Sequence, residues 1–158
     1  MGPGTVRQAT MISMRALSSV FIDTGAFLAL VDPKDTYFEA ASEFYRGLGA
    51  AVRQYTSWAV VAETYTWLRY HLDATKAAQW LGRFEDAEKS ALIQVIYPER
   101  DLDLRTRRLL YQFHDQALSY ADAFTLSVLE SRPDIKAVFA FDHHMALAGV
   151  TILPGPVA

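Results

Sequence analysis

Cysteine is missing from this chain of 158 residues. Its absence excludes disulfide bonds, zinc sites built from thiolates, and enzymes that use a cysteine nucleophile. A chain without cysteine is compatible with a reducing compartment.

Long apolar runs are missing as well. The best candidate, residues 20–31, is interrupted by Asp23 and falls short of the roughly 20 residues that cross a bilayer. The same acid argues against a secretory signal peptide at the N-terminus. We therefore expect a cytoplasmic protein that does not enter the membrane.

An excess of positive charge is also absent, because the net charge is -3 and the pI is about 5.8. Without a global basic field, strong nonspecific binding to nucleic acid is disfavoured. An enzyme whose acidic centre is neutralised by metal ions stays compatible with this charge.

Several catalytic motifs are missing. There is no G-x-x-x-x-G-K-[ST] for a P-loop, no G-x-G-x-x-G after the first expected strand, and no G-x-S-x-G elbow. A haloacid-dehalogenase-like phosphatase needs a second Asp two residues after its first, where this chain has Gly25.

What is present predicts one globular domain, since 51% of residues are hydrophobic and 21% are charged. Residues 1–15 are expected to be an N-terminal extension, either irregular or a remnant of cloning, with alternative starts at Met11 and Met14. Residues 16–158 are expected to form the domain.

Short apolar runs alternate with amphipathic stretches, which predicts strands alternating with helices. The expected strands are 18–22, 52–56, 92–96, 137–141 and 150–153. The expected helices are 25–31, 37–49, 57–72, 76–88, 98–115, 120–131 and 143–148. This order predicts an α/β fold in three layers, α/β/α, around a central parallel sheet of four to five strands.

Four acidic residues stand at break points of this pattern. Asp23 and Asp142 directly follow expected strands, Asp122 lies in the first turn of a helix, and Glu63 lies in the second turn of another. Because ligands of parallel sheets bind at the carboxyl ends of the strands, we expect all four at the same edge.

Helix capping is an alternative explanation for three of these acids. Ser119-x-x-Asp122 matches a capping box, and Asp23 and Asp142 each precede an expected helix. Glu63 lies too deep in its helix to cap it.

The neighbours of these acids favour a metal site over a network of salt bridges. Neither Glu63 nor Asp122 has a Lys or Arg three or four residues away. Clustered carboxylates raise one another's pKa, and a divalent cation reverses that cost. Oxygen ligands select Mg²⁺ or Mn²⁺.

Other polar residues have two explanations each. Asp115 is a fifth candidate acid or a solvated loop residue, and His143 and His144 either contact phosphate or face solvent. The arginines of residues 105–108 form either a basic patch for RNA or a solvated helix face. The tryptophans stand at helical spacing and are expected mostly in the core; they are Trp58, Trp67 and Trp80.

Over residues 20–154 the chain resembles PIN-domain proteins, specifically the VapC-type ribonuclease toxins of toxin–antitoxin systems. The matching segments are Asp23-Thr24, Thr56-Ser57 through Glu63-Thr64, Ser119-Tyr120-Ala121-Asp122-Ala123, Phe141-Asp142-His143-His144, Gly149 and Leu153-Pro154, with Asp115 before the third motif. Departures at Gly25, Gln116-Ala117 and Met145 remove no ligand carboxylate and bear on substrate fit.

The resemblance implies an endoribonuclease that uses Mg²⁺ or Mn²⁺ and has a PIN-like fold. Asp23, Glu63, Asp122 and Asp142 would hold one or two metal ions and carry the catalysis. Three residues would orient these ligands without binding metal themselves: Thr24, Ser119 and Asp115. The implied partners are an RNA substrate, a cognate antitoxin and a second copy of the chain in a homodimer.

Two other functions stay open. The first is a PIN-like binding or regulatory module without catalysis, which the acidic pI favours. The second is a PIN nuclease of RNA processing, which would share the site and lack an antitoxin.

Overall fold

Residues 16–155 are described by the structure, a computed structural model. The expected extension at residues 1–15 lies outside this range. The strands are β1 (Ser19–Ile22), β2 (Arg53–Ser57), β3 (Ile93–Ile96), β4 (Ala137–Ala140) and β5 (Thr151–Pro154). The helices are α2 (Thr24–Val31), α3 (Phe38–Arg46), α4 (Trp58–His71), α5 (Ala74–Lys89), α6 (Arg100–Gln112), α7 (Tyr120–Ser131) and the 3₁₀ helix η1 (His143–Ala148).

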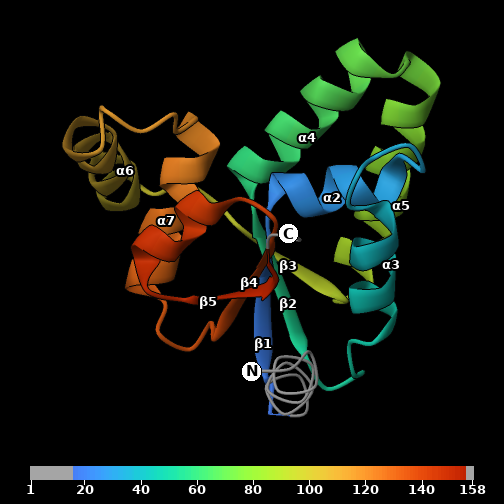
Figure 1. The fold of residues 1–158 in the computed structure, drawn as a ribbon, viewed down its shortest axis with the longest axis horizontal. Helices are drawn as coiled ribbons and strands as arrows, with labels where there is room; N and C mark the ends of the chain where they lie inside the picture. Colours follow the sequence, from blue (N-terminus) through green and yellow to red (C-terminus); the bar gives the residue numbers. More distant parts are fainter. Residues whose placement is uncertain (1–15, 156–158) are drawn as a thin grey trace, which may run out of the picture.

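The five strands form one parallel sheet in the order β3-β2-β1-β4-β5. Helices α2 and α3 lie on one side of it and α6 and α7 on the other (Figure 1). The expected three-layer α/β/α fold with a parallel sheet is therefore confirmed. Among residues 16–155, no helix is long and apolar enough to span a membrane.

Burial explains which strands lie in the centre. Every residue of β1 and β4 is buried, and both are short apolar runs. A strand covered on both faces reads as a continuous apolar run in a parallel sheet. The edge strand β3 is only partly buried. The largest fully buried side chains include Phe21, Phe124 and Phe139.

The register of β1 with β4 aligns their carboxyl ends. Phe21 pairs with Val138 and Ile22 with Phe139, and the Asp23 N–H donates to the Phe139 carbonyl at 3.1 Å. The residues that follow the two strands therefore begin at the same edge of the sheet.

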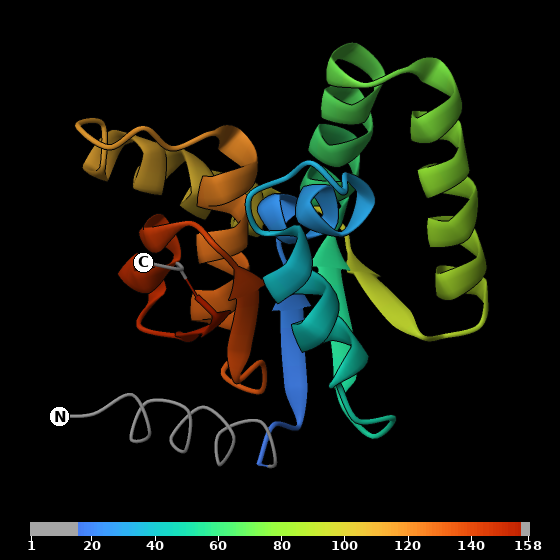
Figure 2. The same cartoon turned by 45° about the vertical axis from the view of Figure 1, so that its right-hand side comes forward.

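Helices α4 and α5 form a hairpin that extends past this edge (Figures 1 and 2). Ser57 ends β2 and caps α4, since its Oγ accepts a hydrogen bond from the Val60 N–H at 3.2 Å. Strand and helix thus join directly. This junction places Glu63 above the carboxyl end of β2.

Candidate metal centre

Asp23 is the most buried acid of the structure's described part, with 3% of its surface exposed. It occupies the N-cap position of α2, yet its side chain makes no capping hydrogen bond. The side-chain capping considered for Asp23 is therefore wrong. Instead, Asp23 Oδ1 accepts a long hydrogen bond from the Thr125 hydroxyl, at 3.4 Å. Sequence reasoning did not identify Thr125, which shares a helix with Asp122.

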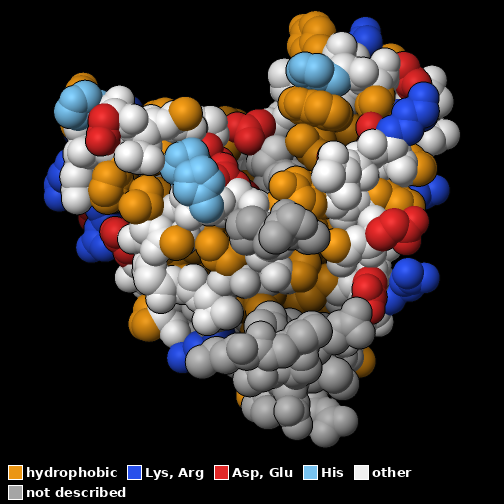
Figure 3. All heavy atoms as spheres, viewed as in Figure 1, with side chains coloured by type: hydrophobic (Ala, Val, Ile, Leu, Met, Phe, Trp, Pro, Cys, Tyr) orange, Lys and Arg blue, Asp and Glu red, His pale blue; other side chains and the backbone are white. Residues whose placement is uncertain are grey.

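The charges of the other three acids act on the Asp23 carboxyl group. Burial and, after it, the charges of Asp122, Glu63 and Asp142 raise the pKa of Asp23, which a backbone hydrogen bond at Thr24 lowers in part; the net result is a rise from 3.8 to about 7. Acids that act on the same carboxyl group share one small region. Figure 3 shows acidic side chains gathered in the hollow between the α4–α5 hairpin and the α6–α7 side. Their role as metal ligands stays a prediction.

The raised pKa of Asp23 predicts how stability depends on pH in the metal-free protein. A folded pKa of about 7, above the ordinary 3.8, means that the folded state holds this proton more tightly than the unfolded chain does. The contribution of Asp23 to stability is thus complete below about pH 4 and is lost as the pH rises through about 7. Urea unfolding of the metal-free protein at a series of pH values between about 4 and 8 measures this contribution. A contribution from Asp23 that grows toward pH 8 would contradict the expectation.

Asp122 is fixed by the predicted capping box. The Ser119 Oγ accepts from the Asp122 N–H at 3.0 Å, and the Ser119 N–H donates to Asp122 Oδ2 at 2.9 Å. Burial raises the pKa of Asp122, the Ser119 hydrogen bonds lower it, and the charge of Asp142 raises it. Capping and membership of the acidic cluster are therefore compatible, because the cap uses Oδ2 and not Oδ1.

Asp142 caps η1 as expected, since its Oδ1 accepts from the His144 N–H at 2.9 Å. Its Oδ1 also lies 2.8 Å from His144 Nδ1 and 3.7 Å from His143 Nδ1. His143 is exposed, whereas His144 is largely buried and does not face solvent. Both imidazoles therefore stand beside a carboxylate of the cluster.

Glu63 is half-buried on α4. It lies beside a shallow hollow of about 420 Å³ that is lined by Ala62, Thr66, Trp67, Tyr70 and His71. Its helix neighbour Thr64 is fully buried. Glu63 thus joins the acids from the projecting hairpin, while the other three come from residues at the sheet or from α7.

The chemistry of this cluster fits a divalent cation. Among residues 16–155, the carboxylates of Asp23, Glu63 and Asp122 form no salt bridge with Lys or Arg. Thr24 Oγ1 is buried beside Asp23 without a hydrogen-bond partner in the protein. Buried polar groups left unsatisfied cost about 1–3 kcal/mol each. Four carboxylates and a free hydroxyl form the oxygen-rich donor set that Mg²⁺ and Mn²⁺ prefer.

Asp115 is not brought into the cluster. The expected helix 98–115 ends at Gln112, and Asp115 is exposed in the turn that follows. It is not among the groups that shift the pKa of Asp23 or Asp122. Arg105, Arg107 and Arg108 are exposed on α6, and Arg107 pairs with Asp103 at 2.7 Å.

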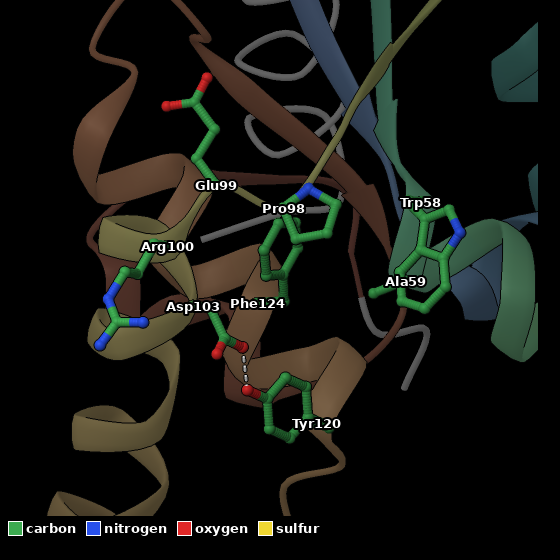
Figure 4. Close-up of a pocket in the computed structure, with 8 residues that line it drawn as sticks. All are labelled: Trp58, Ala59, Pro98, Glu99, Arg100, Asp103, Tyr120 and Phe124. Carbon is green, nitrogen blue, oxygen red and sulfur yellow. Dashed lines mark hydrogen bonds between the residues drawn. The ribbon is translucent and has the colours of Figure 1, made fainter.

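A separate pocket of about 380 Å³ lies where α4, α6 and α7 begin (Figure 4). Its lining residues are Trp58, Ala59, Pro98, Glu99, Arg100, Asp103, Tyr120 and Phe124. The Tyr120 hydroxyl donates to Asp103. Trp58 is 52% exposed, so the expectation of a core position is wrong for it; Trp80, at 8%, is in the core as expected. Trp58 is the first residue of α4 and lines this pocket, whereas Trp80 packs against Phe27 and Phe84.

Several solved structures share this fold. VapC20 of Mycobacterium tuberculosis, described as a sarcin-ricin loop cleaving toxin, superposes with a TM-score of 0.71 at 22% identity, covering 84% of this chain and 96% of VapC20. FitAcB of Neisseria gonorrhoeae gives 0.57 at 17%, covering 84% and 95%. FitAB bound to an IR36 DNA fragment gives 0.62 at 16%, covering 87% and 94%.

Neither a family model nor a curated protein sequence matches the chain. The structural neighbours include a toxin of the type that the sequence motifs resemble, and they confirm the PIN-like fold.

Proposed function

We propose that this protein is a metal-dependent endoribonuclease that acts as the toxin of a VapBC-type toxin–antitoxin pair. The observation that carries the proposal is the buried carboxyl group of Asp23, on which the charges of Asp122, Glu63 and Asp142 act and to which no Lys or Arg of residues 16–155 is paired. The order of the sequence motifs and the fold shared with VapC20 support it.

The four carboxylates would hold one or two Mg²⁺ or Mn²⁺ ions. The bound cation supplies Lewis acidity toward the attacking water and the scissile phosphate. The chain itself fixes the ligands: Ser119 orients Asp122 through its backbone N–H, and the His144 N–H orients Asp142. A carboxylate held in one position before the substrate arrives needs no further ordering during the reaction.

The donor set and the fold together support hydrolysis by water rather than a covalent intermediate. In this reaction the water oxygen bonds to phosphorus, the bond from phosphorus to the leaving nucleoside oxygen breaks, and that oxygen takes up a proton. Neither a cysteine nor a nucleophilic elbow is present in the sequence. The carboxylates therefore serve as ligands and proton acceptors.

We propose an antitoxin and a second copy of the chain as protein partners. Aromatic side chains beside Glu63 support an apolar contact surface, because Tyr70 is 81% exposed and Trp67 borders the same hollow. Exposed apolar groups that adjoin a functional site commonly mark a protein interface. A partner seated there would cover Glu63, which lines the same hollow.

Metal dependence is the direct test. Purified protein freed of copurifying antitoxin should cleave RNA with Mg²⁺ or Mn²⁺ and lose this activity in EDTA, because the four carboxylates repel one another without a cation. Adding Mn²⁺ back should restore cleavage. Gel analysis of several structured RNAs, including one that carries a sarcin-ricin loop, provides the measurement.

Other outcomes assign other functions. Cleavage that survives EDTA would overturn the metal-dependent mechanism. Folded protein that binds no Mn²⁺ in calorimetry and cleaves no RNA would instead support a binding module. Cleavage by a protein whose gene lacks a neighbouring antitoxin gene would support a nuclease of RNA processing.

A further inference from the structure

Two histidines border the acidic cluster with their ring nitrogens turned toward one carboxylate. The ligating atoms of Asp142, His143 and His144 all lie within 4.8 Å of one another. The two imidazole rings are 4.2 Å apart, centre to centre, and are tilted by 33°. Three potential ligands thus come from three consecutive residues at the start of η1.

His144 Nδ1 is a buried atom that lacks a hydrogen-bond partner. It lies 2.8 Å from Asp142 Oδ1, where a protonated imidazole would form an ion pair, but it makes no hydrogen bond there; the same oxygen accepts from the His144 N–H. A buried ring nitrogen close to a carboxylate oxygen, and not bonded to it, is the arrangement that a shared cation would satisfy.

The separations match those between ligands of one small metal ion. Ligands at about 2.0–2.1 Å from a tetrahedral zinc ion are about 3.4 Å from one another. The two measured distances from Asp142 Oδ1, 2.8 Å to His144 Nδ1 and 3.7 Å to His143 Nδ1, fall on either side of that value. His143 is exposed, so its side chain can adjust without disturbing the core.

We propose that Asp142, His143 and His144 form a site for a borderline transition-metal ion, Zn²⁺, distinct in chemistry from the all-oxygen centre. Imidazole nitrogens favour Zn²⁺ and Ni²⁺, whereas carboxylates and water favour Mg²⁺ and Mn²⁺. The open positions of the ion would be filled by water, since three protein ligands leave one tetrahedral position free.

Sharing Asp142 makes the two metals compete. A Zn²⁺ ion on Asp142 Oδ1 would neutralise much of the charge of this carboxylate and repel a second divalent cation near its other oxygen. Zn²⁺ therefore inhibits Mg²⁺-dependent RNA cleavage, a consequence that rests on the proposed function. The binding of Zn²⁺ itself does not rest on it.

Calorimetry of untagged protein with Zn²⁺ alone, near neutral pH, tests the site. The change is His143→Ala, which removes one ligand at an exposed position, and the matched control is His114→Ala, another exposed histidine. We expect Zn²⁺ affinity to fall at least about 10-fold in His143→Ala, because losing a ligand costs at least as much as losing its supporting partner. His114→Ala should bind Zn²⁺ as the parent protein does.

Visible absorption of bound Co²⁺ provides a second readout, since nitrogen ligation changes its spectrum and the change should be lost in His143→Ala. Equal Zn²⁺ affinity in the parent, His143→Ala and His114→Ala proteins would overturn the site. So would an equal loss of affinity in both variants.

Cleavage assays separate this inference from the proposed function. With Mg²⁺ present, added Zn²⁺ should inhibit the parent protein at lower concentrations than His143→Ala. Zn²⁺ binding that depends on His143 in a protein that never cleaves RNA would leave the site standing and reject the nuclease. Metal-dependent cleavage without His143-dependent Zn²⁺ binding would reject the zinc site and leave the nuclease standing.

Discussion

Replacing Asp23 with Asn is expected to abolish RNA cleavage and, at the same time, to stabilise the metal-free protein. Asp23 is buried at the centre of the acidic cluster, and burial together with three acidic neighbours raises its pKa to about 7. The amide has the same shape and no charge, so the substitution removes both a proposed metal ligand and a source of repulsion. We expect cleavage to fall by at least about 100-fold and the free energy of unfolding at pH 8 to rise by roughly 1–4 kcal/mol.

Opposite effects on activity and stability distinguish this site from a structural one. When a residue only holds the fold together, its substitution lowers both the activity and the stability of the protein. Asp86→Asn, at an exposed position of α5, is the matched control and should change neither. Cleavage rates and urea unfolding of metal-free protein give the two measurements. An Asp23→Asn protein that cleaves at the parental rate would refute the assigned role.

Phe139→Ala is expected to destabilise the protein by about 3–5 kcal/mol, the usual cost of removing a buried aromatic side chain. Phe139 is fully buried in β4, and its ring lies 4.6 Å from that of Phe44 and 6.1 Å from that of Phe141, centre to centre. Its carbonyl accepts the hydrogen bond from the Asp23 N–H. Loss of this side chain therefore loosens the strand end that positions both Asp23 and Asp142.

Thermal or urea unfolding measures the loss, and residual cleavage at low temperature shows whether the acidic cluster survives. Tyr111→Ala serves as the matched control, because Tyr111 is 80% exposed and its removal should change stability by less than about 0.5 kcal/mol. Similar stabilities of the two variants would contradict the central position assigned to Phe139.

The placement of Asp23 and Asp142 at one edge of the sheet could be predicted from the sequence because it depends on chain connectivity. In a parallel sheet every strand ends at the same edge, so an acid that follows a strand is placed by topology alone. Asp23 and Asp142 are positioned in this way. The apolar runs of β1 and β4 are equally predictable, since central strands are covered on both faces.

Contacts between distant segments could not be predicted. Thr125 contacts Asp23 although it lies 102 positions later in the chain, and no rule of sequence spacing connects the two residues. The exposure of Trp58 and Asp115, which lie at or just beyond helix ends, could not be predicted either. Whether a residue at a helix end is covered depends on neighbouring elements, and periodicity within one helix carries no information about them.

The capping alternatives illustrate a further point. Asp122 and Asp142 do cap helices, and they also belong to the acidic cluster. A carboxylate has two oxygens, so one acid can satisfy a helix end and still offer an oxygen to a ligand. The helix caps are therefore compatible with the metal-ligand role predicted for these two residues.

The projecting α4–α5 hairpin makes the two sides of the acidic cluster mechanically unequal. Asp23 and Asp142 follow central strands that are hydrogen-bonded to neighbours on both sides, whereas Glu63 stands on a helix that extends past the sheet (Figure 2). Motion of the hairpin changes the distance from Glu63 to the other three acids and leaves those three in place. A cation bound by all four acids, as proposed, would link the hairpin to the sheet, and its affinity would depend on how firmly α4 is held at Ser57, where the helix begins.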